Sequence, residues 1–231
     1  MERDKLIKKY NIDIKKLEEE QEKLAKQLEL KDKIDFKLAD RFGAIDNVIL
    51  GNRILSCVIV CDRNFEIIGR AYASEKVKFP YIPGFRAYRE LPAMMLAFNK
   101  LNEKPDVFFI PGQGIIHPKL GLASHFSLAA GVPSIGISDS IIECEIKNED
   151  IFKKGKKVGK ILKIKEGSKP MYVSPGNNIS TEASYELSKS MVKLPHKKPE
   201  PLHLAAKYAK EVRKELEGGK KEENTRLEFQ K

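Results

Sequence analysis

The spacing of hydrophobic and polar positions changes between the ends of the chain and its middle. From about Asp4 to Leu30, apolar residues recur at helical spacing among Lys and Glu, which predicts one amphipathic helix. In the middle the spacing becomes that of strands joined by short turns, and Gly51-Asn52 is a hairpin signal. From Gly218 to Lys231 apolar residues are almost absent, so we expect a disordered basic tail.

Predicted strands and helices alternate through the middle of the chain. The strands are Ala44–Leu50, Ile54–Asp62, Phe65–Ala73, Asp106–Ile110, Ser134–Ser138, Lys157–Lys165 and Met171–Ser174, and the helices are Arg86–Asn102, Gly121–Ala130, Thr181–Val192 and Glu200–Leu216. The unbroken apolar run Asp106–Ile110 is typical of a strand buried on both faces, and strand–helix–strand order implies a parallel crossover. The pattern predicts an α/β fold in which antiparallel strands continue into parallel ones, with helices packed over the sheet.

The length and composition suit one compact domain with additions at each end. A chain of 231 residues with 41% hydrophobic content can bury one ordinary core. We therefore expect a helical segment over residues 1–40 that packs on the core, a domain over 41–217, and a disordered basic tail over 218–231.

The net charge of +10 favours a polyanionic partner, nucleic acid first and an anionic membrane surface second. The basic residues are spread along the helices and tail, which is also the pattern of solvated helix faces. No apolar segment has the length of a membrane span, and the polar N-terminus lacks the apolar stretch of a signal peptide. The three cysteines have no metal-ligand spacing and are typical of reduced, buried thiols. These features predict a cytoplasmic protein.

Two motifs carry a family resemblance. PYIPGFRAYRELP (Pro80–Pro92) and PGQGIIHPKLGLASHFSLAAGVPSIGIS (Pro111–Ser138) closely resemble signatures of the endonuclease V family, in the same order and at the expected separation. The resemblance extends from about Leu17 to Tyr208 and implies a ribonuclease-H-like fold. Members of this family cleave a phosphodiester near deoxyinosine in DNA, or inosine in RNA, with a divalent metal held by acidic side chains.

The resemblance implies a metal site that is only partly retained. Asp46 and Glu90 match two metal-binding carboxylates of the family, whereas Pro111 and, less securely aligned, Ala206 stand where the family has aspartates. Hard ions such as Mg²⁺ or Mn²⁺ require clustered carboxylates. The resemblance therefore implies reduced or absent cleavage. From the residues alone, Asp46 is also compatible with a strand-edge carboxylate, and Glu90 with a first-turn helix residue that interacts with the helix dipole.

Other family positions have also changed. The family's histidine in the glycine loop is Gln113, its His-Arg pair is Asn177-Asn178, and its lysine after the later strand is Asp139. Asp139 follows a strand expected beside Asp106–Ile110, where the carboxyl ends of strands converge on a crevice. A rearranged catalytic and metal-binding set of Asp46, Glu90 and Asp139 is one interpretation of these changes, and a simple turn or helix-capping aspartate is the other.

Two loops are candidate nucleic-acid contacts. By resemblance, the Pro80–Gly84 loop (Pro80, Tyr81, Ile82, Pro83 and Gly84) is a wedge pushed between bases; otherwise it is a rigid cap on the core. Gly112 and Gly114 match the family's pocket for an everted base, although Pro111-Gly112 also suits an ordinary type II turn. His117 is placed either to contact a substrate phosphate or to cap the following helix.

Three hypotheses follow. The first is an endonuclease V-like protein that binds inosine-containing or distorted DNA or RNA with cleavage weakened or lost. The second is an active nuclease that uses Asp46, Glu90 and Asp139 with Mg²⁺ or Mn²⁺. The third is a non-catalytic subunit that recruits a protein partner through its N-terminal helix.

Overall fold

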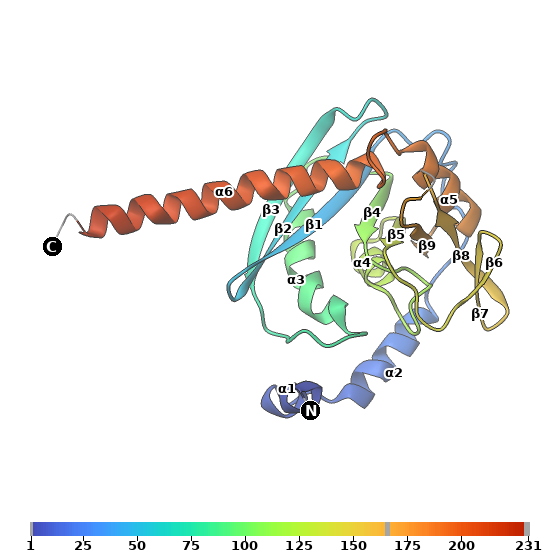
Figure 1. The fold of residues 1–231 in the computed structure, drawn as a ribbon, viewed down its shortest axis with the longest axis horizontal. Helices are drawn as coiled ribbons and strands as arrows, with labels where there is room; N and C mark the ends of the chain where they lie inside the picture. The colour runs from blue at the N-terminus through green and yellow to red at the C-terminus, as the bar shows by residue number, and fades with distance from the viewer. Residues whose placement is uncertain (1, 165–166, 229–231) are drawn as a thin grey trace.

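The computed structural model describes residues 2–164 and 167–228, and over these residues one sheet carries helices on both faces (Figure 1). The strand order is β3-β2-β1-β4-β5-β9-β8-β7-β6. The strands are β1 (Phe42–Leu50), β2 (Arg53–Cys61), β3 (Ile67–Lys76), β4 (Val107–Pro111), β5 (Ser134–Ser138), β6 (Glu145–Lys147), β7 (Asp150–Lys153), β8 (Lys156–Leu162) and β9 (Met171–Asn177). The helices are α1 (Glu2–Lys9), α2 (Ile14–Ala25), α3 (Arg86–Asn99), α4 (Leu122–Ala130), α5 (Thr181–Ser190) and α6 (Glu200–Glu228).

The sheet has the predicted mixture of strand directions. β1 and β2 form an antiparallel hairpin, with Leu50 paired to Arg53 and Gly51 at a φ of +57°, a conformation that favours glycine. β1–β4 and β4–β5 are parallel, which confirms the crossover through α4. The predicted α/β class with a mixed sheet is therefore confirmed.

The alternation of side chains along β1 divides the core into two layers. Ala44 is buried in the hydrophobic cluster that includes Leu202 and Ala205 of α6, whereas Ile45 is buried in the cluster that includes residues of α3 and α4. Because successive side chains of a strand point to opposite faces, Asp46 faces the layer covered by α6. Its neighbour Asn47 faces the layer covered by α3.

The N-terminal segment is two helices, where the sequence predicts one. α1 and α2 are separated by Asn11, whose φ of +50° a continuous α-helix does not permit. Asp13 then caps α2, because its Oδ1 accepts a hydrogen bond from the backbone N of Lys16 at 3.0 Å. The prediction of one unbroken helix was therefore wrong, because the capping signal at Asp13 outweighs the apolar stripe.

Two other regions differ from the predictions. The hairpin of β6 and β7 was not predicted, because β6 is only 3 residues long and exposed along its length, which is too short a run to indicate a strand. α6 continues to Glu228, past Gly218-Gly219 and into the segment for which the sequence predicts a disordered basic tail; whether this segment is ordered in solution stays a prediction. The last three residues of the predicted tail, and Lys165 at the end of a predicted strand, lie outside the described residues.

Within residues 2–164 and 167–228, the helices are too short or too polar to cross a lipid bilayer.

Candidate nucleic-acid and active site

The carboxylate of Asp46 lies in the middle of β1, where burial makes its ionised form unfavourable. Asp46 pairs with Cys57 across the hairpin and lines a cavity of about 210 Å³ between the sheet and the start of α6. Burial raises the pKa of Asp46 above its ordinary value of 3.8, although a hydrogen bond from the Asn47 backbone and the charges of Lys198 and Arg86 oppose the rise. A carboxylate held in this way is a candidate functional group.

The cavity around Asp46 contains both positions at which the family resemblance implies lost aspartates. Pro111, at the end of β4, and Ala206, on α6, line its wall together with Lys198 and His203. The tertiary structure therefore places Pro111 and Ala206 beside Asp46, as the resemblance implies. Neither side chain offers an oxygen ligand.

Glu90 lies on α3, beyond the opposite face of β1, where two neighbouring side chains occupy both of its oxygens. Nε of Arg86 donates to Oε1 at 2.5 Å, and Nδ2 of Asn47 donates to Oε2 at 2.8 Å. Nη1 of Arg86 also donates to the backbone oxygen of Pro111 at 2.7 Å. The guanidinium thus bridges the carboxylate of Glu90 and the strand end at which the family resemblance places a metal ligand.

This arrangement does not fit a hard divalent ion held by the three predicted carboxylates. Ligands of one ion must lie close together, and the structure does not bring Asp46, Glu90 and Asp139 into a group whose ligand atoms lie within 4.8 Å of one another. Glu90 already accepts two hydrogen bonds, and the fixed positive charge beside it is that of Arg86.

Asp139 is exposed immediately after β5, at the wall of a second and larger hollow. No helix begins there, so it is not a helix cap. The hollow is a groove of about 850 Å³, lined by the Pro80–Gly84 loop, the glycine loop and the first turn of α3. Pro111 and Lys198 line both the groove and the Asp46 cavity, so the two hollows adjoin.

The Pro80–Gly84 loop is divided between core and solvent. Ile82 is 1% exposed and Pro80 is buried, whereas Tyr81 is 58% exposed and lines the groove with Pro83 and Gly84. Gly84 has a φ of +85°, and Nε2 of the buried Gln21 in α2 donates to its carbonyl at 3.0 Å. The loop is thus anchored at Ile82 and presents Tyr81 to the groove, with the Arg89 guanidinium 5.9 Å from the centre of its ring.

The two glycines after β4 serve different purposes. Gly112 lines the groove, where an added Cβ would lie 3.3 Å from Nη1 of Arg86. Its φ lies outside the left-handed region, so the turn is not the type II turn that Pro111-Gly112 suggests. Gly114 is buried, and a Cβ there would lie 2.1 Å from the carbonyl oxygen of Pro175, so close approach of β9 requires glycine at this position.

His117 takes part in a local turn and does not cap α4. Its Nδ1 accepts a hydrogen bond from the backbone N of Lys119 at 3.2 Å, whereas the N-cap of α4 is Gly121. Burial, together with the charge of Lys153, lowers the pKa of His117 to about 4, so the ring is neutral at pH 7. It lines the groove as a polar, uncharged group.

Sequence reasoning missed Arg86, which lies one helical turn before Glu90; that spacing was the available signal. It also missed a group of three side chains, His196, Glu200 and His203, at the start of α6. The spacing of Glu200 and His203, three residues apart on one helix face, was the available signal, whereas His196 joins them from the preceding loop.

Comparisons with known proteins agree with this geometry. The family model for endonuclease V matches residues 22–207. The chain is 38% identical to an endonuclease V of Dictyoglomus turgidum over 210 residues, covering 86% of this chain and 90% of that protein. It is 35% identical to an endonuclease V of Thermosipho melanesiensis over 224 residues, covering 92% and 94%.

Solved structures show the same fold. Endonuclease V of Bacillus subtilis superposes with a TM-score of 0.81 at 25% identity, covering 91% of this chain and 96% of that one. Endonuclease V of Ciona intestinalis, solved with a 24mer DNA containing an inosine followed by a ribo-adenosine, superposes with a TM-score of 0.79 at 22% identity, covering 88% and 98%.

The fold thus has the ribonuclease-H-like architecture of the endonuclease V class of nucleases. The chain belongs to the endonuclease V family. Membership supports nucleic-acid binding and an endonuclease V-type role, and it is consistent with the use of a divalent cation.

Proposed function

We propose that this protein binds inosine-containing or distorted DNA or RNA in the groove beside Tyr81, with cleavage that is weakened or lost. The observation that carries the proposal is the lining of the Asp46 cavity, in which Pro111 and Ala206 stand where family resemblance implies aspartates. Removing ligands from an ion site costs much activity, because neighbouring groups do not restore the same geometry.

The contacts of Arg86 support the loss of cleavage without a loss of binding. Its guanidinium supplies a positive charge between Glu90 and Pro111, and Lys198 also lines the groove. Guanidinium and ammonium groups bind phosphate without a metal. Affinity is therefore expected to survive in chelator and to fall as salt rises.

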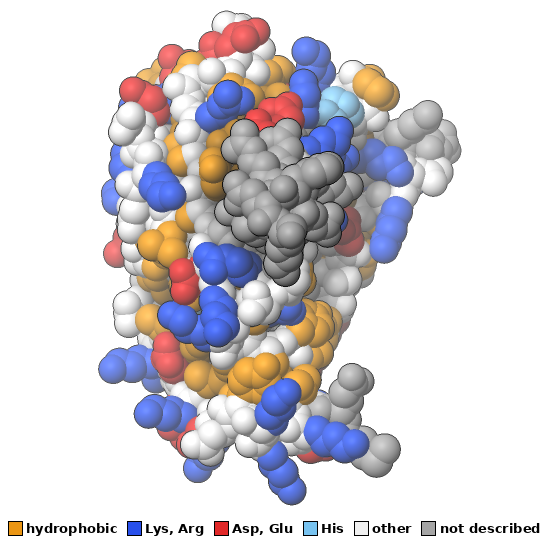
Figure 2. All heavy atoms as spheres, turned by 90° about the vertical axis from the view of Figure 1, so that its left-hand side faces the viewer, with side chains coloured by type: hydrophobic (Ala, Val, Ile, Leu, Met, Phe, Trp, Pro, Cys, Tyr) orange, Lys and Arg blue, Asp and Glu red, His pale blue; other side chains and the backbone are white. Residues whose placement is uncertain are grey.

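The basic surface is consistent with contacts to the phosphate backbone spread over several elements. Lys and Arg side chains are scattered among hydrophobic ones on the face shown in Figure 2 and are not gathered in one patch. Base recognition is accordingly assigned to the groove, with Tyr81 as the exposed aromatic side chain and Gly112 at its wall. The proposal covers both DNA and RNA.

The experiment uses an end-labelled duplex with one deoxyinosine, its RNA counterpart, and matched strands with adenine or guanine in place of the inosine base. Each is incubated with the purified protein in Mg²⁺, in Mn²⁺ and in chelator. A retarded, uncut band that persists in chelator and prefers inosine is the expected result.

Two other outcomes would contradict the proposal. Efficient metal-dependent nicking beside inosine would instead support a nuclease that uses Asp46, Glu90 and Asp139, and loss of cutting in Asp46→Asn and Asp139→Asn would assign the site. Neither retardation nor cutting would point to a protein-interaction role for the N-terminal helices.

A further inference from the structure

We propose that His196, Glu200 and His203 form a binding site for a borderline divalent transition ion such as Zn²⁺, at the wall of the Asp46 cavity. In residues 2–164 and 167–228, these three make up the group of His, Cys, Asp or Glu residues whose ligand atoms all lie within 4.8 Å of one another. Two imidazoles and one carboxylate are a ligand set that zinc takes in proteins. The proposal does not depend on whether the protein cleaves nucleic acid.

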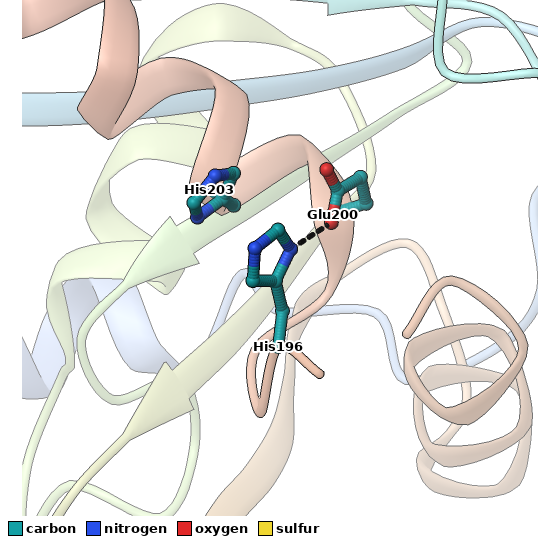
Figure 3. Close-up of side chains that lie close together, drawn as sticks. All are labelled: His196, Glu200 and His203. Carbon is teal, nitrogen blue, oxygen red and sulfur yellow. Dashed lines mark hydrogen bonds and ion pairs between the residues drawn. The ribbon is translucent and has the colours of Figure 1, made fainter. Parts of the chain in front are cut away.

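Local structure holds the three side chains together (Figure 3). Glu200 and His203 lie three residues apart in the first turns of α6, so both project from the same side of the helix. His196 is in the preceding loop, which is closed at its base by a β-bridge between Val192 and Pro199 and by a 2.7 Å hydrogen bond from the N of Glu200 to the carbonyl of Met191. The site therefore combines a helix with an anchored loop.

The side chains already contact one another. Nδ1 of His196 lies 2.6 Å from Oε2 of Glu200, and the rings of His196 and His203 stack with their centroids 3.6 Å apart (Figure 3). Ligands about 2.0–2.1 Å from a tetrahedral zinc ion lie roughly 3.4 Å from one another. The ligand atoms of the three side chains lie within 4.8 Å of one another. Because His203 is exposed, rotation of its side chain can bring its ring nitrogen closer to the other two ligand atoms without repacking the core.

Glu200 gives the site its charge. Its side chain is only 8% exposed, and a carboxylate at such depth is stable when it is paired or bound to a metal. Lys197 and Lys198 line the same cavity as His196 and His203 and oppose a cation, as does the N-terminal end of α6. The carboxylate of Asp46, in the same cavity, favours the binding of a cation. The positive and negative charges around the site therefore nearly offset each other. A hard ion, which is bound mainly by electrostatic attraction, is disfavoured, whereas an ion that forms coordinate bonds to imidazole is favoured.

Three protein ligands are the number found at zinc sites that keep a position open for water or substrate. The site opens on the cavity that also contains Asp46 and Lys198, where a phosphate oxygen or a water molecule would complete the coordination. The structure thus assigns to this cavity a cation position different from the carboxylate site implied by the family resemblance.

The test is a Co²⁺ titration of the full chain after chelator treatment, followed by the visible absorption of bound cobalt, with Zn²⁺ as competitor. One equivalent of Co²⁺ is expected to bind and to be displaced by one equivalent of Zn²⁺. His203→Ala should weaken binding at least tenfold, because it removes one of three ligands. His203→Asp, which keeps a ligand atom at this position, should recover part of the affinity with an altered spectrum.

His117→Ala is the matched control, because His117 is one of the two histidines outside the group and its removal should leave the titration unchanged. His203 is exposed, so its substitution should not unfold the chain; equal thermal denaturation of wild type and variant in chelator checks this point. Absence of cobalt absorption in the wild type, or equal affinity in His203→Ala, would overturn the proposal.

Discussion

Nε of Arg86 lies 2.5 Å from Oε1 of Glu90, one turn further along α3, and the same guanidinium reaches the carbonyl of Pro111. The Glu90 side chain is 13% exposed, so the pair is sheltered from solvent on its acidic side. A second pair with the same spacing, Arg213 and Glu217 on α6, has about half of each side chain exposed. The two pairs share their chemistry and spacing and differ in burial.

We expect Arg86→Ala to lower the free energy of unfolding by about 1–3 kcal/mol, because it leaves a sheltered carboxylate without its cation. A double-mutant cycle with Glu90→Gln, measured by denaturant unfolding, should give a coupling energy above 1 kcal/mol. The same cycle on Arg213 and Glu217 should give about 0.3–0.5 kcal/mol, as is usual for exposed helix pairs. Equal coupling in the two cycles would show that the burial of Glu90 has no energetic consequence.

Asp46→Asn should stabilise the protein at pH 7. The raised pKa of Asp46 means that ionisation costs more in the folded than in the unfolded state, so this cost is present above the folded pKa and disappears below about 3.8, where both states are protonated. The melting temperature of the variant should exceed that of the wild type at pH 7, by roughly 2–4 °C for each kcal/mol. The difference should vanish near pH 3. A variant less stable than the wild type at pH 7 would contradict this account of Asp46.

Restoring carboxylates to the Asp46 cavity should restore metal-dependent cleavage. In Pro111→Asp/Ala206→Asp, oxygen ligands would line the cavity beside Asp46, and we expect the rate of Mg²⁺-dependent nicking beside inosine to rise at least tenfold over the wild type. Lys207→Asp is the control, because it adds a carboxylate at an exposed position next to Ala206. A similar gain in the control, or no gain in the double variant, would argue against the substituted ligands as the cause of weak cleavage.

Tyr81→Ala should reduce affinity for inosine-containing strands by about tenfold or more, since a stacked base contributes roughly 1–3 kcal/mol. Stability should be unchanged, because the ring is 58% exposed. Tyr72→Ala removes a partly exposed tyrosine from β3 and should leave affinity unchanged. Ile82→Ala, one residue along the loop, should instead cost about 2–4 kcal/mol of stability, because Ile82 is buried. Gel-shift titrations and denaturant unfolding separate the two effects.

His125 should contribute to acid sensitivity. Burial lowers its pKa to about 4, from an ordinary value of 6.5, so the unfolded state takes up a proton in a range where the folded state does not. Its stabilising contribution is therefore complete above pH 6.5 and is lost as the pH falls towards 4. Between these limits the wild type should lose up to about 3 kcal/mol more stability than His125→Phe, measured by urea unfolding at each pH. Parallel pH profiles for the two proteins would count against this assignment.

The sequence by itself determined much of the fold. Alternation and turn signals located β1 and β2, and the apolar runs located β4 and β5, because strands buried on one or both faces leave a direct trace in residue order. The PYIPGF and PGQG motifs indicated the endonuclease V family, which the match of the family model over residues 22–207 confirms. The weaker signals failed: β6 has no buried face, and the N-terminal segment forms two helices separated at Asn11 where one was expected.

Only the tertiary structure decided what surrounds each site residue. The pleat of β1 turns Asp46 towards α6 and Asn47 towards Glu90, so two carboxylates expected in one cluster lie against different layers. The tertiary structure also places the Arg86 guanidinium against the carbonyl at the end of β4. It places His196, which lies in a loop, beside Glu200 and His203 of α6. Such contacts depend on how elements far apart in the chain pack against each other. The distances between their side chains are therefore set by the complete fold and cannot be read from the order of residues.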